Sequence, residues 1–542
     1  MSDSRVEDIL RDQSGMDGKK SNWNTLWSQI AQVIDPTDDY FNKIELAGGE
    51  KRTQHIFDST AQSAAERAAA AVESEIMPRT QRWHGLTLQD ETIKEDPKWK
   101  RWLEQVTNIM FSARYAPYAN FAGQASQSFF SLVKYGTQCM FIDEVVGRHL
   151  RYKAIHLSEI GIAENHVGIV DKVHRCFCLT VRQAIQKFGK ENLPDSIARL
   201  EDKEPERQFD FIHCVKPNEN GDPGAKRMEF VSYYVAKEGR HIVQVGGYRT
   251  MPYVVSRLRT SPKEIYGRSP AMTALADVRM LNEMEKTNIR AAHRVVDPPL
   301  LLAEDGALQA FSVRPNALNY GGVDENGRAR AIPLQTGANL NLSLEMTEAK
   351  RKSINDIFWL TLFQILVQNP QMTATEAMLR AQEKGQLLAP VMGGQQSEWG
   401  GQQITRELDI LSHAGQLPPP PAPLAEVDLD VVYTGPWARA QRAGDGVAIM
   451  NTLNAVLPFA QIDQKVLKRF NFDEITTELA DINGMPASCL YTDDEMEAND
   501  AATASAEQAQ AAVEAAPQLS QSVLNLAKAN QAASTPAPTV GG

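Results

Sequence analysis

The stretch from Ser343 to Gly415 constrains this chain most, because it predicts two long helices with one short break between them. Residues 344–367 are charged at the start and apolar at the end. The uncharged segment 368–372 follows, and Pro370 within it lacks an amide hydrogen and pushes the preceding residue out of the helical region. Helix restarts at once, because residues 373–376 have the capping-box pattern Thr-x-x-Glu. The break is therefore either a plain connector or a functional tip between two rods.

Another long helix is predicted before this stretch, over residues 271–296. Ser269 is a natural N-cap, Pro270 suits the first helical position, and Asp297-Pro-Pro ends the run. At 1.5 Å per residue this helix would be about 40 Å long, and the helix over 344–367 about 36 Å. The two matched helices flank a turn-rich insert, residues 298–342. The simplest arrangement is an antiparallel helix pair with a small module at its far end.

The remaining pattern predicts an α+β chain that is mainly helical. Apolar periodicity predicts four early helices, over residues 23–34, 61–76, 98–114 and 119–134. Short strand-like runs then follow between turn signals, at residues 138–142, 173–179, 209–215, 229–235 and 241–245, with a helix over 180–188 among them. These runs predict an antiparallel β-rich region inside a helical frame.

The C-terminal part predicts further helices joined by stiff or polar segments. The helix that begins at residue 373 is expected to kink near Pro390 and Gly393-Gly394, before a polyproline linker at residues 418–423. Helices are expected at residues 438–457, 463–471 and 474–483. The Ala/Gln/Pro-rich end has one further helical pattern at residues 511–528, and residues 534–542 are expected to be disordered.

Composition and charge exclude several classes of protein. Five cysteines, of which only Cys176 and Cys178 are close together, predict reduced thiols and no zinc site. The N-terminus has no apolar signal segment, and the longest apolar run is shorter than the ~20 residues of a membrane span. The net charge of −12 lies mostly after residue 424, where sixteen acidic residues face five basic ones up to residue 514. This balance is unlike that of a protein that grips nucleic acid.

No catalytic template fits the sequence. Neither Gly-Lys pair has the glycine spacing of a phosphate-binding loop, and the G-x-S-x-G, H-E-x-x-H and paired C-x-x-C patterns do not occur. The ten histidines are scattered. The densest carboxylate run, Asp493-Asp-Glu495, would suit a metal-dependent nuclease, but in a loop-like stretch it more simply solvates the chain.

Basic side chains gather on the two long predicted helices. They are Lys350, Arg351 and Lys352 on the later helix and Arg279, Lys286, Arg290 and Arg294 on the earlier one. One interpretation is a solvated helix face paired with Glu345 and Glu348; the other is positive charge that faces a polyanion in a channel or a neighbouring subunit. Glu283 and Glu285 interleave with the earlier group and favour pairing between helices over a DNA-binding stripe.

The order and spacing of several short motifs resemble the head-to-tail connector, or portal protein, of short-tailed bacteriophages (podoviruses). The motifs are a Trp-rich N-terminal helix, Phe57-Asp-Ser-Thr60 before an Ala-rich helix, Tyr266-Gly-Arg-Ser-Pro270, Asp297-Pro-Pro-Leu300 and Met372-Thr-Ala-Thr-Glu376. The resemblance spans almost the whole chain, although the segment after about Asp493 matches only in composition.

The resemblance implies a portal-like arrangement of wing, stem, clip and crown. The wing would be residues 1–265, the stem helices 266–297 and 343–367, and the clip 298–342. The long kinked wing helix would be 373–417, the helical crown 424–492 and a partly disordered tail 493–542. The tunnel loop that faces the DNA channel would be Gln368, Asn369, Pro370, Gln371 and Met372.

The resemblance also implies a ring, usually of twelve subunits, at one capsid vertex. Double-stranded DNA would pass through it during packaging, retention and ejection. The implied partners are further copies of the chain, the terminase packaging motor, a tail adaptor protein, and the major capsid and scaffolding proteins. The protein would assemble in the host cytoplasm and reside in the virion, with no membrane, metal or cofactor. The alternative is another structural virion or assembly protein without a DNA channel.

Two observations from the residues themselves support this interpretation. Apolar residues occur on several sides of the paired helices, more than an isolated hairpin could bury: Leu275, Val278, Leu281, Ile289, Ile354, Ile357, Phe358 and Leu362. Lateral packing in a ring would cover them. The acidic balance suits a conduit, because each phosphate contact strengthens binding and a channel must release its DNA.

Overall fold

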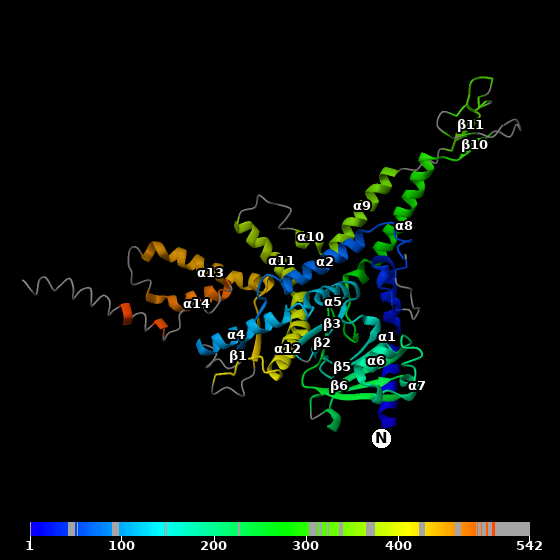
Figure 1. Cartoon of the computed structure of the whole chain (residues 1–542). Helices are drawn as coiled ribbons and strands as arrows, with labels where there is room; N and C mark the ends of the chain where they lie inside the picture. The colour runs from blue at the N-terminus through cyan, green and yellow to red at the C-terminus, as the bar shows by residue number, and fades with distance from the viewer. Residues whose placement is uncertain are drawn as a thin grey trace, which may run out of the picture. The chain divides into compact units, whose positions relative to one another are not determined.

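The computed structural model describes residues 2–41, 49–50, 52–88, 97–145, 147, 149–219, 221–225, 228–302, 312, 314, 317–320, 322–323, 325–334, 340–364, 374–421, 429–460, 468–483, 485, 489, 495–496 and 501–503. Within these ranges the chain is mixed α+β and mostly helical (Figure 1). It divides into two compact units. The first comprises Met1–Thr87, Gln105–Pro420 and Asp428–Gly444, and the second the remaining segments. The predicted wing, stem, clip and crown boundaries stay predictions.

The predicted N-terminal helices are all present, and the first is much longer than expected. The helices are α1 (Ser2–Ile34), α2 (Thr60–Ile76), α4 (Pro97–Arg114) and α5 (Phe121–Tyr135). The Trp-rich stripe that predicted this helix covers only the last third of α1. The prediction missed the earlier residues because the polar first half of the helix shows little apolar periodicity. Five alanines of α2 are buried, and α2 packs along α5. Small side chains therefore allow these two helices to approach closely.

Two antiparallel sheets form the β-rich region. The three-stranded sheet has the order β3-β2-β9, and the five-stranded sheet has the order β4-β5-β6-β7-β8. The bounds are β2 (Thr137–Val145), β3 (His149–Ala154), β4 (Ile160–Glu164), β5 (Val170–Thr180), β6 (Gln208–Pro217), β7 (Phe230–Ala236), β8 (His241–Tyr248) and β9 (Tyr253–Arg257). All five predicted runs are strands. Helix α6 (Val181–Phe188) interrupts them as predicted, with a capping box between Thr180 and Gln183.

The antiparallel helix pair is present with a two-stranded sheet at its far end (Figure 1). Helix α8 spans Pro270–Val296 and α9 spans Leu340–Ile357, and β10 (Leu300–Leu302) pairs with β11 (Ala331–Pro333). The predicted single helix over 344–367 is wrong. It ends at Ile357, and a separate short helix, α10 (Leu360–Gln364), follows. The two rods are therefore not matched in length, since α8 has 27 residues and α9 has 18.

The long helix after the break is continuous through its proline. Helix α11 (Ala374–Gln395) contains Pro390, and its end merges into a π-helical turn, η5 (Gln396–Gly401), and then α12 (Gln402–His413). The irregularity thus lies a few residues beyond the expected kink. A π-helical turn is a recognised cause of helix bending and is frequent at functional sites.

The C-terminal part holds more than the predicted helices. Helices α13 (Pro436–Ala460) and α14 (Phe472–Asn483) match two predicted ones, but β12 (Leu429–Tyr433) was not expected and pairs with β1 (His84–Leu88). Within the second compact unit, Gly446 of α13 lies 3.4 Å, measured from an ideal Cβ, from the side chain of Ile482. The predicted helix over 511–528 and the disordered end lie outside the described residues, as does most of the helix predicted over 463–471.

The expectation that the stem needs neighbours to cover its apolar residues is wrong for most of the residues that carried it. Leu275, Val278, Leu281, Ile354 and Phe358 are buried in one core cluster with α1, α2 and the three-stranded sheet. Of the predicted set, Ile289 is clearly exposed, at 41%. Helices α1 and α2 and the three-stranded sheet of the same chain therefore cover the root of the helix pair. In the described residues, none of the helices combines the length and apolarity needed to cross a membrane.

Candidate functional site at the stem helices and the break that follows

Polar contacts hold α8 and α9 together along one face of each helix. Asp277 accepts hydrogen bonds from Lys350 Nζ (2.9 Å) and Ser353 Oγ (3.0 Å), and further along the pair Asn288 accepts one from Ser343. The hydrogen bond from Lys350 lowers the pKa of Asp277 below its ordinary value. These contacts set the antiparallel register of the stem.

Arg351 of α9 contacts both α8 and the segment just before α2. Its guanidinium pairs with Glu285 of α8 at 2.6 Å, with Asp58 at 2.9 Å, and with Glu348 one turn earlier at 2.5 Å. Burial alone would raise the pKa of Asp58, but hydrogen bonds from Thr60 together with Arg351 hold that pKa below its ordinary value. One arginine therefore connects three segments, and its charge is used within the chain.

The other predicted basic residues point away from this shared face. Arg279, Arg290, Arg294 and Lys352 are exposed and form no ion pair with other residues of the described ranges. Lys286 pairs with Glu283 on its own helix at 3.0 Å. The structure thus separates two groups that the sequence could not separate. Lys350 and Arg351 face the partner helix, while the others lie on the outer faces.

The entry to α8 explains the Tyr266-Gly-Arg-Ser-Pro270 motif. Ser269 Oγ accepts the amide of Met272 at 3.1 Å and donates to the carbonyl of Lys134 at 2.8 Å, so the N-cap also fixes the helix to α5. At Gly267 an added Cβ would collide with the backbone of Gly136. The motif therefore places the first turn of the stem directly against the wing.

The break between α9 and α10 lies at Trp359, nine residues before the predicted start of the loop at residue 368. Trp359 has φ +59°, which costs a residue with a side chain roughly 1–2 kcal/mol. Its amide still bonds Asp356 O at 3.0 Å, while its carbonyl accepts from Phe363 at 3.1 Å. Beside it, Phe358 is fully buried. Burial of Phe358 and the turn at Trp359 redirect the chain after α9.

The predicted tunnel-loop residues Gln368, Asn369, Pro370, Gln371 and Met372 lie outside the described residues, as does Thr373 of the predicted capping box. The described helices on either side still locate the segment between α10 and α11. Its role as a tunnel loop therefore stays a prediction.

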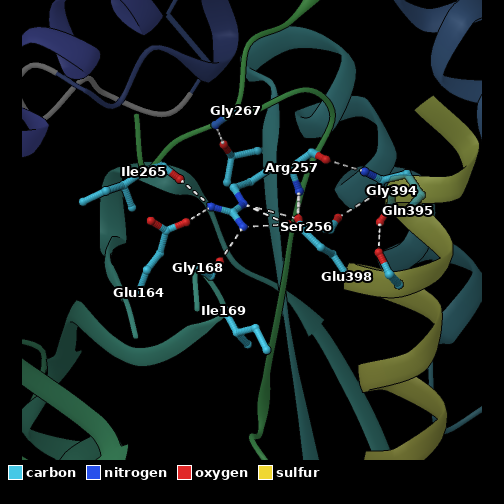
Figure 2. Close-up of polar contacts among 12 residues, drawn as sticks. Glu164, Gly168, Ile169, Ser256, Arg257, Ile265, Gly267, Gly394, Gln395 and Glu398 are labelled. Atoms are coloured by element: carbon cyan, nitrogen blue, oxygen red, sulfur yellow. Dashed lines mark hydrogen bonds and ion pairs between the residues drawn. The ribbon is translucent and has the colours of Figure 1, made fainter. Parts of the chain in front are cut away.

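Contacts of a single arginine, Arg257, anchor the π-helical turn that follows α11 (Figure 2). Arg257, at the end of β9, donates from Nη2 and Nε to Glu398 of η5, at 2.6 and 3.1 Å, and forms an ion pair with Glu164. Its remaining donors reach the carbonyls of Ile265 and Gly168, both at 3.2 Å. Every nitrogen of the Arg257 guanidinium therefore has a partner within the chain, and the residue is only 7% exposed.

Gln395 supplies the second half of the same anchor. Its amide nitrogen donates to the carbonyl of Arg257 at 2.7 Å, and its oxygen accepts from Ser256 at 2.8 Å, with Gln395 fully buried. The anchor fixes the far end of the helix that begins just after the predicted loop. The sequence analysis missed Arg257, Gln395 and Glu398. The one available signal was a polar and a charged residue beside Gly393-Gly394 in an otherwise long helix.

A second buried ion pair holds α12. Arg114 of α4 and Glu407 of α12 are both fully buried, and Glu407 also accepts from Tyr152 at 2.7 Å. His84 lies 2.8 Å from the guanidinium. Burial and the charge of Arg114 hold the pKa of His84 well below its ordinary value, so the imidazole is neutral. These contacts hold α12 against α4.

The described residues contain no cluster of three or more metal-binding side chains. Cys176 and Cys178 lie two apart on β5, with Cys178 donating to Asp210 at 3.0 Å.

The chain matches the family described as "Bacteriophage head to tail connecting protein" over residues 7–491. It belongs to this family. It is 29% identical over 482 residues to the probable portal protein of Bordetella phage BPP-1, covering 86% of this chain and 85% of that protein. It is 23% identical over 510 residues to the portal protein of Salmonella phage epsilon15, covering 92% and 91%. Membership makes it a phage head-to-tail connector of the portal family, a structural virion component and not an enzyme.

Among solved structures, chains of a native gene transfer agent virion and of the neck of an empty gene transfer agent particle are similar. Each covers 76% of this chain and 91% of its own length, at a TM-score of 0.37, with 9% and 10% identity. The family assignment rests on the sequence matches.

Proposed function

We propose that this chain forms a ring, of twelve copies, whose central channel carries double-stranded DNA at one vertex of the capsid. The ring would serve packaging, retention and ejection of the genome and would be the attachment site of the tail. The observation that carries the proposal is the family match across residues 7–491. Both relatives named above, which the chain covers almost fully, bear the name portal protein.

The outer half of the stem supports assembly of several copies. Its root is buried within the chain, but Ile289, Leu342, Leu344 and Met346 are 41–55% exposed. Exposed apolar patches of this kind mark interaction surfaces. The two-stranded sheet at the end of the stem adds Leu301 and Ile332, which are 53% and 57% exposed. An isolated two-stranded sheet is marginally stable, so it too is expected to contact neighbours.

Residues Gln368–Met372 would form the constriction of the channel. They join α10 to α11, and α11 leads into the Arg257 anchor. The segment is uncharged and the chain carries a net charge of −12, so DNA would slide past it instead of being held through its phosphates.

The partners proposed follow from the same assignment. The terminase packaging motor would dock at the clip, residues 298–342, and a tail adaptor protein would later take its place. The major capsid and scaffolding proteins would surround the ring at the portal vertex. Assembly would take place in the host cytoplasm.

The first test is the oligomeric state of the purified full-length chain. Native mass spectrometry is expected to give a ring near twelve times 60.1 kDa. Electron microscopy is expected to show a central hole wide enough for duplex DNA, which a virion or assembly protein without a channel would lack. A stable monomer at micromolar concentration would contradict the proposal.

The second test addresses the loop. Deletion of Gln368–Met372 is expected to leave the ring intact and to impair DNA filling or retention in particles assembled with the variant. A variant that replaces the same residues with Gly and Ser keeps the length of the connection and separates length from sequence. Normal filling and retention with the deletion would show that the segment is a plain connector.

A further inference from the structure

The outer faces of the two stem helices carry charge patterns of opposite sign. The α8 stripe consists of Arg279, Glu283, Lys286 and Arg290, spaced four, three and four residues apart, so that all four lie on one side of the helix. The α9 stripe consists of Glu345, Glu348, Lys352 and Asp356, spaced three, four and four residues apart. Three of the four residues are basic in the α8 stripe, and three of the four are acidic in the α9 stripe. The α8 stripe is therefore basic and the α9 stripe acidic.

Both stripes lie opposite the contact between α8 and α9 within one chain. That contact uses Asp277, Glu285 and Asn288 of α8, which lie on another side of the helix from Arg279 and Arg290. On α9 it uses residues 343, 350, 351 and 353. The stripe residues are exposed except Lys286, which is half-buried. Two of them also have partners within the chain, because Lys286 pairs with Glu283 and Glu348 pairs with Arg351. Each chain thus presents one basic and one acidic outer face.

Read in opposite directions, the two stripes match sign for sign. Along α8 from residue 279 the order is plus, minus, plus, plus, and along α9 backwards from residue 356 it is minus, plus, minus, minus. Antiparallel alignment of Arg279 with Asp356 places Glu283 beside Lys352, and Arg290 beside Glu345. Lys286 then lies beside Glu348. The hairpin's own contacts, such as Asp277 with Lys350, follow a register about one helical turn away.

A ring of identical subunits brings these faces together in this direction. Rotation about the ring axis leaves every α8 pointing the same way along the axis, and every α9 the opposite way. The α8 of one copy therefore meets the α9 of the next copy antiparallel. Such a contact is head-to-tail, joining two different surfaces, and repeats until the ring closes. It does not require either face to pair with itself.

The stripes are flanked by exposed apolar side chains. Met280 is 49% exposed beside the α8 stripe, and Leu342 and Met346, beside the α9 stripe, are 55% and 53% exposed. Apolar contact would supply most of the free energy of association, while charge would select the partner face and its register. Burial of Met and Leu around paired charges is a usual composition for a protein interface.

We propose that the α8 stripe of one copy binds the α9 stripe of the neighbouring copy, with Arg279 opposite Asp356 and Arg290 opposite Glu345. The proposal rests on the ring assembly proposed above and specifies its lateral stem contact. A phosphate backbone is the other polyanion that the α8 stripe could face. The acidic α9 stripe, whose sequence of signs complements it, favours a second copy of the chain.

Charge reversal on one face at a time tests the proposal in the full-length chain. The α8 variant combines Arg279→Glu with Arg290→Glu, and the α9 variant combines Glu345→Lys with Asp356→Lys. Each alone places like charges together, so each is expected to need at least about tenfold more protein to form rings than the unsubstituted chain. A mixture of the two is expected to assemble again, because alternating copies restore opposite charges at every contact of an even-numbered ring.

A combined variant with all four substitutions is expected to form rings by itself. Thr361→Val is the control for the α9 variant, because Asp356 accepts a hydrogen bond from Thr361, and it is expected to assemble like the unsubstituted chain. Ring formation is followed by native mass spectrometry and electron microscopy.

The outcomes separate the two proposals. If the unsubstituted chain forms no ring, the proposed function fails. If the ring forms and either charge variant assembles normally, the stem contact proposed here is wrong. Normal rings from the α8 variant with a loss of DNA packaging would assign that stripe to the DNA. Failure of both the mixture and the combined variant to recover would also overturn the proposal.

Discussion

Arg114 and Glu407 form an ion pair in which neither side chain is exposed to solvent. Nη2 of Arg114 lies 2.5 Å from Oε2 of Glu407, and its Nε lies 3.1 Å from both carboxylate oxygens. The pair joins α4 to α12 across 293 residues of sequence. Burial alone would lower the pKa of Arg114, but Glu407 outweighs it and the pKa is raised. The Arg114 guanidinium is therefore charged although it is fully buried.

Removal of one member of this pair should destabilise the chain strongly. Arg114→Met leaves the Glu407 carboxylate buried without its cation, at a cost of about 3–5 kcal/mol. Urea unfolding at one fixed protein concentration measures the loss in free energy of unfolding. Arg199→Ala removes the exposed pair with Asp195 and is the control, with an expected change within about 0.5 kcal/mol. Equal effects of the two substitutions would contradict the prediction.

Replacement of Arg257 by lysine should destabilise the chain. The guanidinium reaches Glu398, Glu164 and two carbonyls at once, and a lysine ammonium cannot reproduce this planar set of donors. Arg257→Lys is therefore expected to lose roughly 2–4 kcal/mol of unfolding free energy. The control is Lys237→Arg, the reverse exchange at a surface position where the side chain is only weakly paired. A fully stable Arg257→Lys variant would show that the geometry of the anchor is not required.

Replacement of Trp359 by glycine should reduce the free energy of unfolding less than replacement by alanine. Trp359→Gly and Trp359→Ala both remove the side chain, but only glycine adopts φ +59° without steric cost. The glycine variant is expected to be more stable than the alanine variant by roughly 1 kcal/mol in thermal or urea unfolding. The reverse order would mean that the residue leaves the left-handed conformation in the assembled protein.

Acid should destabilise the chain partly through His174. Burial, with repulsion from Lys172 and Lys216, lowers the pKa of His174 from 6.5 to about 4. The unfolded chain therefore binds more protons than the folded chain between these two pH values. The stability contributed by the neutral imidazole is complete above about pH 6.5 and falls as pH drops toward about 4.

The variant His174→Gln is expected to reduce this pH dependence. The slope of unfolding free energy against pH, measured between pH 6.5 and 4, should fall by at most about 1.4 kcal/mol per pH unit, with the largest change near the middle of this range. The amide of Gln can still meet Gln13, whose oxygen lies 3.1 Å from Nδ1 of His174. The matched control is His241→Gln, the same exchange at the exposed start of β8. An unaltered slope in His174→Gln would contradict the prediction.

Local signals in the sequence located most helices and five of the strands. Ser269 and Pro270 fixed the start of α8, and Asp35 with Pro36 fixed the end of α1. These signals act over a few residues, so they can be recognised without knowledge of the fold. The strands β3, β4 and β9 were missed because each is short, with five or six residues, and β4 and β9 also lack a clear alternation of apolar and polar residues.

The sequence by itself determined the helix pair, its turn-rich insert, the break after it and the resemblance to the connector family. Only the tertiary structure decided where the second stem helix ends and which charges are used within the chain. Phe358 is buried against the wing, and Arg351 binds Asp58, 293 residues away. Such choices depend on side chains brought together from distant segments, which helical periodicity does not encode. The same contacts leave Arg279 and Arg290 on the outside, opposite in sign to the outer face of α9.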